Sequence, residues 1–331
     1  MTAPLGRFLD RAARHAAALP AAEAVDWVLG HGLFSLARHP GLAAPLRQRL
    51  AEAAQRNLAA NLFVIHRFQQ VRDRLADIDV CPLKGIHLLD TVYRAHPGER
   101  RIGDLDLLVR RGDAEGAVAA LADLGLEEHV VPGGDEAPER VLVDQRLSVE
   151  IHTRLGIKHG PRSAWEDLVP LPGELHDRRV HLLDRETTLV HLVAHWVKHG
   201  PVVELRWAED ILRWAAAGVD GAAALALARR LGAERTFVAG VRVLRTAAGD
   251  DLLPGVPSTL AGAAGRAIRW NERWLWRLDA ADPFAVGRRS TALARNLTAL
   301  LLADRPSDAL SFFAIKAREL VARRRAGAVR R

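Results

Sequence analysis

The chain has 331 residues, of which 49% are hydrophobic and 26% charged, and its formal net charge is +7. This length supports a sizeable core and more than one structural unit, and the composition is ordinary for a globular protein. The single cysteine, Cys81, excludes an intrachain disulfide and a metal site built from several cysteines. We expect it to be a small buried apolar side chain, in a protein of the reducing cytoplasm.

No membrane segment or secretory signal is expected, because the sequence has no apolar run of about eighteen residues and no apolar stretch near its N-terminus. Residues 323–331 are rich in arginine. Two interpretations of this basic tail stay open: a solubilising surface, and a contact with a phosphate-bearing partner such as nucleic acid.

Residues 1–77 predict an N-terminal helical block. Apolar residues recur at helical spacing over 22–36 and again over 42–77. The predicted buried stripe of the longer segment consists of Leu50, Leu58, Leu62, Ile65, Phe68, Val71 and Leu75. No cluster of candidate catalytic side chains stands out in this block.

Residues 78–184 predict a small mixed α/β core, which opens with a strand at 78–83 and a helix at 86–95. Lys84 and Gly85 stand at the turn between them. A glycine there lets backbone N–H groups approach a ligand, and a helix N-terminus favours phosphate. Both residues are therefore candidates for phosphate binding; the alternative for Lys84 is an exposed lysine at a strand end.

The next strand carries two aspartates, Asp104 and Asp106, followed by an apolar run to Val109. Side chains at i and i+2 of a strand point to the same face, about 7 Å apart along it. Two carboxylates held this close resist joint ionisation, and a divalent cation such as Mg²⁺ relieves their repulsion. In the alternative, Asp104 caps a turn and Asp106 faces solvent on an edge strand.

A third acidic residue lies in a predicted hairpin of strands 140–144 and 147–153, after a helix capped by Asp113 and a strand at 126–131. Glu150 and His152 are two residues apart and share one strand face. Three carboxylates on neighbouring strands form a two-metal phosphoryl-transfer site. After the hairpin, 156–178 reads as irregular and 180–183 as a short strand.

Several of these segments together resemble a known family. The segments are LKG at 83–85, RIGDLDLLV at 101–109, a helix ending in LG and VEIH at 149–152, joined by HWVKH and LRWAED further on. They resemble the bacterial family called uncharacterised nucleotidyltransferase, within the DNA-polymerase-β-like superfamily. The resemblance covers roughly residues 60–215, and it implies an α+β nucleotidyltransferase core.

The resemblance implies metal-dependent transfer of a nucleoside monophosphate, with Asp104, Asp106 and Glu150 as metal ligands. The Gly-Ser turn that binds phosphate in the wider superfamily is replaced here by Lys84-Gly85. Lys84 is then expected to hold the triphosphate as a point charge. Arg101 is a further candidate for the phosphates, whereas Arg100 is expected to face solvent.

Residues 185–331 predict a C-terminal helical block with helices near 186–199, 204–217, 221–231, 235–248, 258–278, 287–303 and 306–325. His191, His195 and His199 share one helix face, where a packed or phosphate-facing role is favoured over zinc. A polar and aromatic cluster follows, consisting of Lys198, His199, Arg206, Trp207 and Asp210. It forms either a wall of the substrate pocket or helix packing around an Arg206–Asp210 pair. Trp270, Trp274 and Trp276 are expected to be core anchors rather than a surface for nucleic-acid bases.

The sequence thus predicts an α+β nucleotidyltransferase that uses Mg²⁺ or Mn²⁺ and an NTP, most simply ATP. Its catalytic and metal residues are Asp104, Asp106 and Glu150, and its nucleotide or acceptor contacts are Lys84, Gly85, Arg101, His152, Lys198 and His199. The acceptor stays open between a small molecule, a peptide or protein, and RNA. Two alternatives remain: a catalytically silent protein of the same fold, and a basic nucleic-acid-binding protein.

Overall fold

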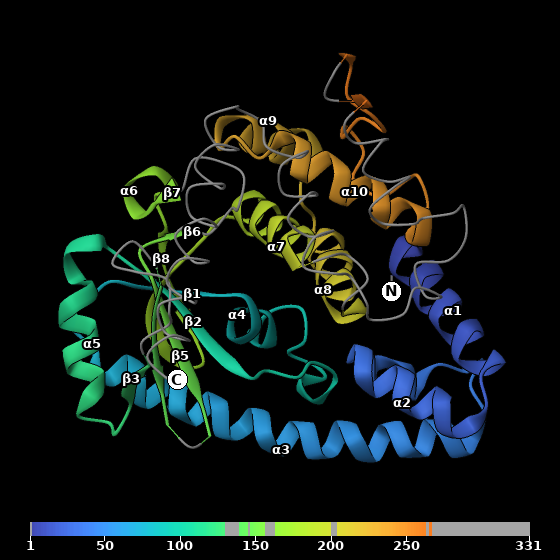
Figure 1. Ribbon diagram of the computed structural model, residues 1–331, viewed down its shortest axis with the longest axis horizontal. Helices are drawn as coiled ribbons and strands as arrows, with labels where there is room; N and C mark the ends of the chain where they lie inside the picture. The colour runs from blue at the N-terminus through green and yellow to red at the C-terminus, as the bar shows by residue number, and fades with distance from the viewer. Residues whose placement is uncertain are drawn as a thin grey trace, which may run out of the picture.

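The computed structural model describes residues 2–129, 139–144, 146–155, 163–199, 204–262 and 265–266, with the side chains of Lys198 and His199 outside this description. The architecture is α+β, as predicted: a small mixed sheet has helices on both sides and helical blocks before and after it in the chain (Figure 1). One continuous hydrophobic core runs from α1 to α10. The division into three parts at residues 77 and 184 stays a prediction.

The N-terminal block consists of α1 (Ala3–Ala18), α2 (Ala21–His31), the short 3-10 helix η1 (Phe34–Arg38) and the long α3 (Ala44–Arg74). The long helix is confirmed, and it runs beneath the rest of the molecule in Figure 1. Its buried stripe differs from the prediction. Leu62 is 57% exposed, whereas Asn57 and Asn61 are buried. The apolar pattern alone did not reveal that two polar side chains belong to the core-facing side.

The central sheet has five strands in the order β1-β2-β5-β4-β3. They are β1 (Val80–Leu83), β2 (Asp104–Val109), β3 (Glu127–His129), β4 (Glu139–Val143) and β5 (Ser148–His152). β2 and β5 are parallel and every other pair is antiparallel. In Figure 1, α5 (Ala114–Ala122) covers one side of the sheet and α4 (Lys84–Asp90) lies on the other. Short 3-10 turns, η2 (Pro97–Glu99) and η3 (Arg111–Asp113), precede and follow β2.

The hairpin predicted from strands 140–144 and 147–153 is confirmed as β4 and β5, with Val143 opposite Ser148. At its turn, the carboxylate of Asp144 accepts hydrogen bonds from the backbone N–H groups of Arg146 and Leu147, at 2.7 and 2.8 Å. Arg67 of α3 binds the same carboxylate at 2.8 Å. The turn is therefore fixed from within and anchored to the long helix, which sets the register of β5.

The stretch predicted to be irregular, 156–178, contains more order than expected. Paired segments β6 (Arg154–Leu155) and β7 (Ser163–Ala164) and the short α6 (Trp165–Leu168) precede a second hairpin, β8 (Leu171–Leu175) with β9 (Arg178–Leu182). The prediction was wrong for 171–175, because Pro172 and Gly173 hid the strand. Both turn residues, His176 and Asp177, have positive φ, so the hairpin closes tightly.

The C-terminal block contains α7 (Arg185–His199), α8 (Leu205–Ala216), α9 (Gly221–Arg230) and α10 (Glu234–Ala248), close to the predicted ranges. The helices predicted over 287–303 and 306–325 lie outside the described residues, as do the tryptophans of the helix predicted over 258–278, whose residues 258–261 are described and are not helical. α1 packs against α8 and α10, so the two helical blocks meet. Within the described helices none is long and apolar enough to cross a membrane alone; α8 and α9 pass together as a pair bent by 118°.

Candidate active site

Asp106 lies at the centre of a polar cluster on the sheet. Its strand, β2, is flanked by β1 and β5, and the residue is only 1% exposed. The alternative with Asp106 facing solvent on an edge strand is therefore wrong. Glu150 is its direct partner across the parallel β2–β5 pair, and parallel partners point to the same face. The predicted alternation therefore brings Asp106 together with Glu150. It also brings Asp106 together with His152, which lies 46 residues further along the chain.

His152, two residues beyond Glu150, completes this cluster. Its Nε2 lies 2.9 Å from Oδ1 of Asp106 and 3.5 Å from Oε2 of Glu150. One ligand atom each of Asp106, Glu150 and His152 lie within 4.8 Å of one another, a spacing that a metal ion can bridge. A cation that holds its ligands at about 2.1 Å keeps them at most about 4.2 Å apart, so a small inward shift suffices. Asp104 shares the strand face, but its carboxylate lies outside this group.

Lys84 provides the positive charge nearest to Asp106. Its Nζ donates a hydrogen bond of 2.6 Å to Oδ1 of Asp106. The residue begins α4 with φ +47°, a left-handed conformation that costs a non-glycine residue about 1–2 kcal/mol. Burial lowers the pKa of the Lys84 ammonium, but the Asp106 carboxylate outweighs it and raises that pKa above its ordinary value. The predicted lysine of the strand–helix turn is thus partly buried and charged, not an exposed strand end.

The three carboxylates ionise unequally. Burial disfavours the charged form of Asp106, but the Lys84 ammonium and the hydrogen bond from His152 hold its pKa well below the ordinary range. Burial, and then the charge on Asp106, raise the pKa values of Asp104 and Glu150. Asp104 and Glu150 resist ionisation because their negative charges would repel that of Asp106, and a divalent cation relieves this repulsion. The donor set therefore suits a metal ion.

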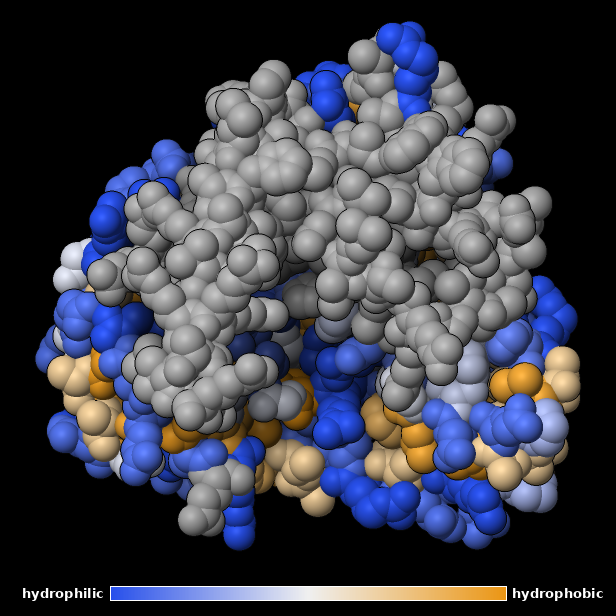
Figure 2. All heavy atoms as spheres, in the orientation of Figure 1, coloured by the Kyte–Doolittle hydropathy of each residue, from blue (hydrophilic) through white to orange (hydrophobic). Residues whose placement is uncertain are grey.

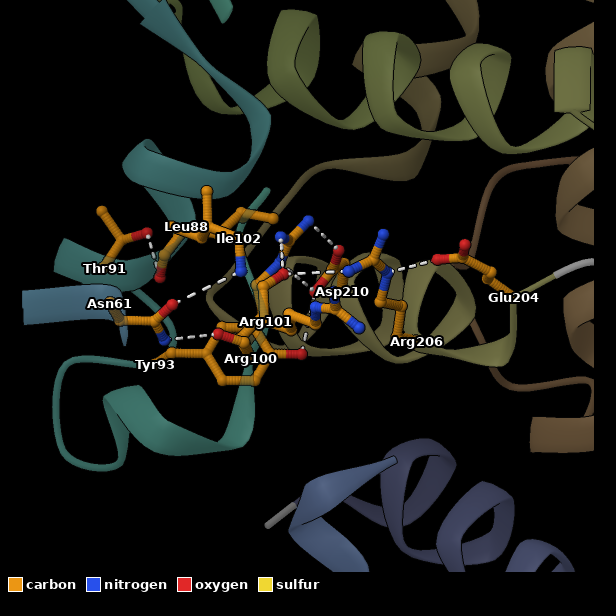
Figure 3. Close-up of polar contacts among 10 residues, drawn as sticks. All are labelled: Asn61, Leu88, Thr91, Tyr93, Arg100, Arg101, Ile102, Glu204, Arg206 and Asp210. Atoms are coloured by element: carbon orange, nitrogen blue, oxygen red, sulfur yellow. Dashed lines mark hydrogen bonds and ion pairs between the residues drawn. The ribbon is translucent and has the colours of Figure 1, made fainter. Parts of the chain in front are cut away.

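The segment leading into β2 is held by a second group of polar contacts (Figure 3). The backbone carbonyl of Arg101 accepts hydrogen bonds from Nη1 of Arg100 at 2.7 Å and from Nη1 of Arg206 at 2.9 Å. From α3, the Asn61 side chain donates to the Arg100 carbonyl at 2.6 Å and to the Pro97 carbonyl at 2.7 Å. The approach to Asp104 is therefore fixed by the N-terminal block on one side and by α8 on the other.

Arg100 is buried, and the prediction that it faces solvent is wrong. Its guanidinium donates to both carboxylate oxygens of Asp210 on α8, from Nε at 3.3 Å and from Nη2 at 2.9 Å. Tyr93 donates to the same carboxylate at 2.9 Å. Asp210 therefore pairs with Arg100, and Arg206 pairs instead with Glu204 at 2.5 Å. A buried arginine needs such a partner, since an isolated charge in the core is very costly.

The charged network continues along the same helix. Arg213 of α8 contacts Glu209 at 2.8 Å and Glu99 at 3.1 Å, and Arg38 reaches Glu99 at 2.6 Å. The contacts of Glu99 with Arg38 and Arg213 were not predicted, because these residues are far apart in the chain. One signal was available: Glu209 and Arg213 lie one turn apart, with Asp210 beside Glu209, on a helix that is otherwise strongly amphipathic.

The remaining predicted residues are distributed as follows. Gly85 is buried beside Arg100 and Ile102, and the side chain of Arg101 is exposed, so its phosphate contact stays a prediction. Lys198 and His199 end α7, with side chains outside the described part. His191 and His195 pack with ring centroids 6.3 Å apart, and His195 also contacts Trp207. Cys81 is fully buried as predicted, and burial raises the pKa of its thiol to about 12.

Figure 2 shows the face of the molecule that is turned to the viewer in Figure 1. Hydrophilic side chains form a band in its middle, near the position of α4 and the turn after it, and hydrophobic side chains are scattered along its lower part. The fold and the site together define a mixed-sheet protein with a cluster of acidic side chains and a basic side chain, Lys84, against it. That combination is the one expected of nucleotidyltransferases.

Comparison with known families agrees with the resemblance seen in the sequence. The family described as uncharacterised nucleotidyltransferase matches residues 11–249, and the chain belongs to this family. The match begins earlier and ends later than the predicted 60–215, so it includes the second half of α1 and all of α10. Neither a curated protein nor a solved structure matches the chain.

Proposed function

We propose that this chain is a metal-dependent nucleotidyltransferase, which moves a nucleoside monophosphate from an NTP, most simply ATP, to an acceptor nucleophile. The observation that carries the proposal is the convergence of Asp106, Glu150 and His152 at one buried point of the sheet, in a member of a nucleotidyltransferase family. The acceptor can be a small molecule, a peptide or protein, or an RNA end.

Asp106 and Glu150 would hold the divalent cation, Mg²⁺ or Mn²⁺, with Asp104 adding a third carboxylate from the same strand face. When bound, the cation neutralises charge on the phosphates and lowers the barrier for attack at phosphorus. His152 keeps Asp106 oriented through its 2.9 Å contact, as partners of metal-binding carboxylates do. Lys84, Gly85 and Arg101 are proposed to hold the polyphosphate, and Lys198 and His199 to line the pocket.

Glu150 is the candidate general base. Its pKa is raised by burial and by the charge on Asp106, which moves it toward the range where a carboxylate accepts a proton from an attacking hydroxyl. It is also less buried than Asp106, so an acceptor can approach it. In this assignment Asp106 stays ionised and only binds the cation, whereas Glu150 completes the cation site and also accepts the proton of the attacking hydroxyl.

The test is turnover of labelled NTPs with Mg²⁺ or Mn²⁺ and a panel of acceptors, for wild type and Asp106→Asn. We expect metal-dependent release of pyrophosphate by wild type and a loss of at least about 100-fold in the variant, as for removal of a group that acts only in the transition state. Arg111→Met serves as the matched control, because Arg111 is exposed and lies beyond the other end of β2.

Two outcomes would favour the alternatives. Binding of NTP and metal without turnover, unchanged in Asp106→Asn, would indicate a catalytically silent protein of this fold. Absence of NTP binding, together with nucleic-acid binding that falls steeply with salt, would indicate the basic nucleic-acid-binding protein instead.

A further inference from the structure

The ammonium of Lys84 occupies the position next to Asp106 where a cation of the active site is expected. It lies 2.6 Å from Oδ1 of Asp106, and only 15% of the lysine side chain is exposed. Its charge also acts on Asp104 and Glu150, whose ionisation it favours. Lys84 thus pairs directly with Asp106, and its charge also favours the ionised forms of the two neighbouring carboxylates.

The same oxygen of Asp106 has two donors. Oδ1 accepts from Lys84 at 2.6 Å and contacts Nε2 of His152 at 2.9 Å. A carboxylate oxygen offers about two lone-pair positions, so Oδ1 is saturated. A divalent cation on this oxygen would lie about 2.1 Å from it. The ammonium would then lie within a few ångströms of a double positive charge, which it repels strongly in a buried site.

The lysine is able to move, because its four-carbon stem is flexible and its ammonium is a point charge without fixed geometry. The backbone at Lys84 is held in the left-handed region, φ +47°, at the first residue of α4. This conformation is unfavourable for a residue with a side chain, and it persists where the surroundings enforce it. The ion pair with Asp106 is one contact that favours it in the protein without metal.

We propose that Lys84 is an exchangeable internal cation: a divalent metal that binds Asp106 displaces the ammonium, and the displaced ammonium then binds the polyphosphate of the nucleotide. This inference rests on the proposed function and adds the order of events: the metal displaces the ammonium, and the ammonium then binds the nucleotide. Metal alone binds weakly, since it must remove Lys84 from its carboxylate. Nucleotide offers the lysine a new anionic partner, so metal and nucleotide each strengthen the binding of the other.

A purely structural ion pair makes the opposite prediction. If Lys84 only stabilises the fold, its removal leaves Asp106 buried without its cation and lowers stability. The coupling between metal binding and nucleotide binding is then the same in wild type and in the variant. The measurement that separates the two roles is therefore metal affinity compared with and without nucleotide, not enzymatic activity.

The experiment measures Mn²⁺ affinity by electron paramagnetic resonance of the free ion, at one pH and ionic strength, with and without a non-hydrolysable ATP analogue. Wild type is compared with Lys84→Met, with Lys84→Gly, which accommodates the left-handed backbone, and with the control Arg111→Met. Circular dichroism and thermal unfolding verify that each variant is folded, and the two Lys84 variants act as independent replacements of the ammonium.

We expect both Lys84 variants to bind Mn²⁺ alone at least about tenfold more tightly than wild type, a factor that corresponds to about 1.4 kcal/mol. The analogue is expected to tighten Mn²⁺ binding in wild type and in Arg111→Met, and to have little effect in the Lys84 variants. Mn²⁺ affinity that is equal or weaker in the Lys84 variants would overturn the exchange while leaving the metal site intact. No Mn²⁺ binding by any of the proteins would overturn the proposed function itself.

Discussion

Arg100 and Asp210 are 110 residues apart in the chain and form a buried ion pair with two hydrogen bonds, at 3.3 and 2.9 Å. The pair joins the segment that leads into β2 to helix α8. The candidate active site and the C-terminal block are therefore connected through charge in the core, and not only through apolar packing.

Asp210→Asn is expected to destabilise the protein by about 3–5 kcal/mol, because it leaves the Arg100 guanidinium buried without a counter-charge. Urea unfolding measures the change. Asp77→Asn, at an exposed aspartate, is the matched control and should have an effect within about 0.5 kcal/mol. Adding Arg100→Met to the Asp210 variant should recover part of the loss, since both charges are then absent. A loss as small as that of the control would contradict the role given to this pair.

Asn61→Leu is expected to cost about 2–4 kcal/mol, although it replaces a polar side chain by an apolar one in the core. The amide of Asn61 is fully buried and donates to the carbonyls of Pro97 and Arg100, which lose their partner in the variant. Leu62→Ala, the neighbouring position on the outer side of α3, should change the unfolding free energy by less than about 1 kcal/mol. Equal effects at the two positions would refute the assignment of the buried stripe.

Gly85→Ala is expected to reduce nucleotide turnover about tenfold or more with a stability loss of about 1–3 kcal/mol. An added Cβ would lie 3.1 Å from Nη1 of Arg100 and 3.2 Å from Cγ1 of Ile102, so the segment before Asp104 has to shift. Gly112→Ala is the control, because a Cβ there meets nothing within 4 Å. Steady-state kinetics and thermal unfolding of both variants are the measurements, and full activity of the Gly85 variant would count against a tight fit at this turn.

Acidification is expected to destabilise the protein partly through His87. Burial lowers the pKa of His87 from 6.5 to about 4, against a small opposing effect of Asp90. Between these values the unfolded chain binds more protons than the folded one, so stability falls as the pH decreases through this window. The contribution is about 2 kcal/mol between pH 8 and pH 5. Urea unfolding of wild type and His87→Gln at both pH values should reveal a smaller pH dependence in the variant; equal dependence would rule out His87 as a source.

Local periodicity was sufficient to predict most of the elements. Alternation along two strands placed Asp104 and Asp106 on one face and Glu150 with His152 on another strand, and the parallel pairing of β2 with β5 brought these faces together. The long helix α3 and the four helices α7 to α10 followed from helical spacing. These features depend on neighbours a few residues apart, which a sequence displays directly.

The errors concern pairs that are distant in the chain. Nothing near Arg100 indicates that Asp210 will neutralise it, so an arginine before a strand was expected to be exposed. The contact of Lys84 with Asp106 was also not predicted, since it joins the start of α4 to β2; the phosphate binding expected of Lys84 stays a prediction. Asn57 and Asn61 were passed over in favour of Leu58 and Leu62, because hydrophobicity ranks the leucines higher while the carbonyls that need the amides belong to another segment.

The turn between β4 and β5 has a consequence of a different kind. Successive residues of a strand face opposite sides, so adding or removing one residue between Val143 and Ser148 would turn Glu150 and His152 away from Asp106. Asp144 fixes this turn through backbone contacts that depend little on the neighbouring side chains. In the history of this family, substitutions at the turn other than at Asp144 should accumulate freely while insertions and deletions are eliminated. For protein engineering, the turn apart from Asp144 is consequently permissive for changes of residue type and intolerant of changes of length.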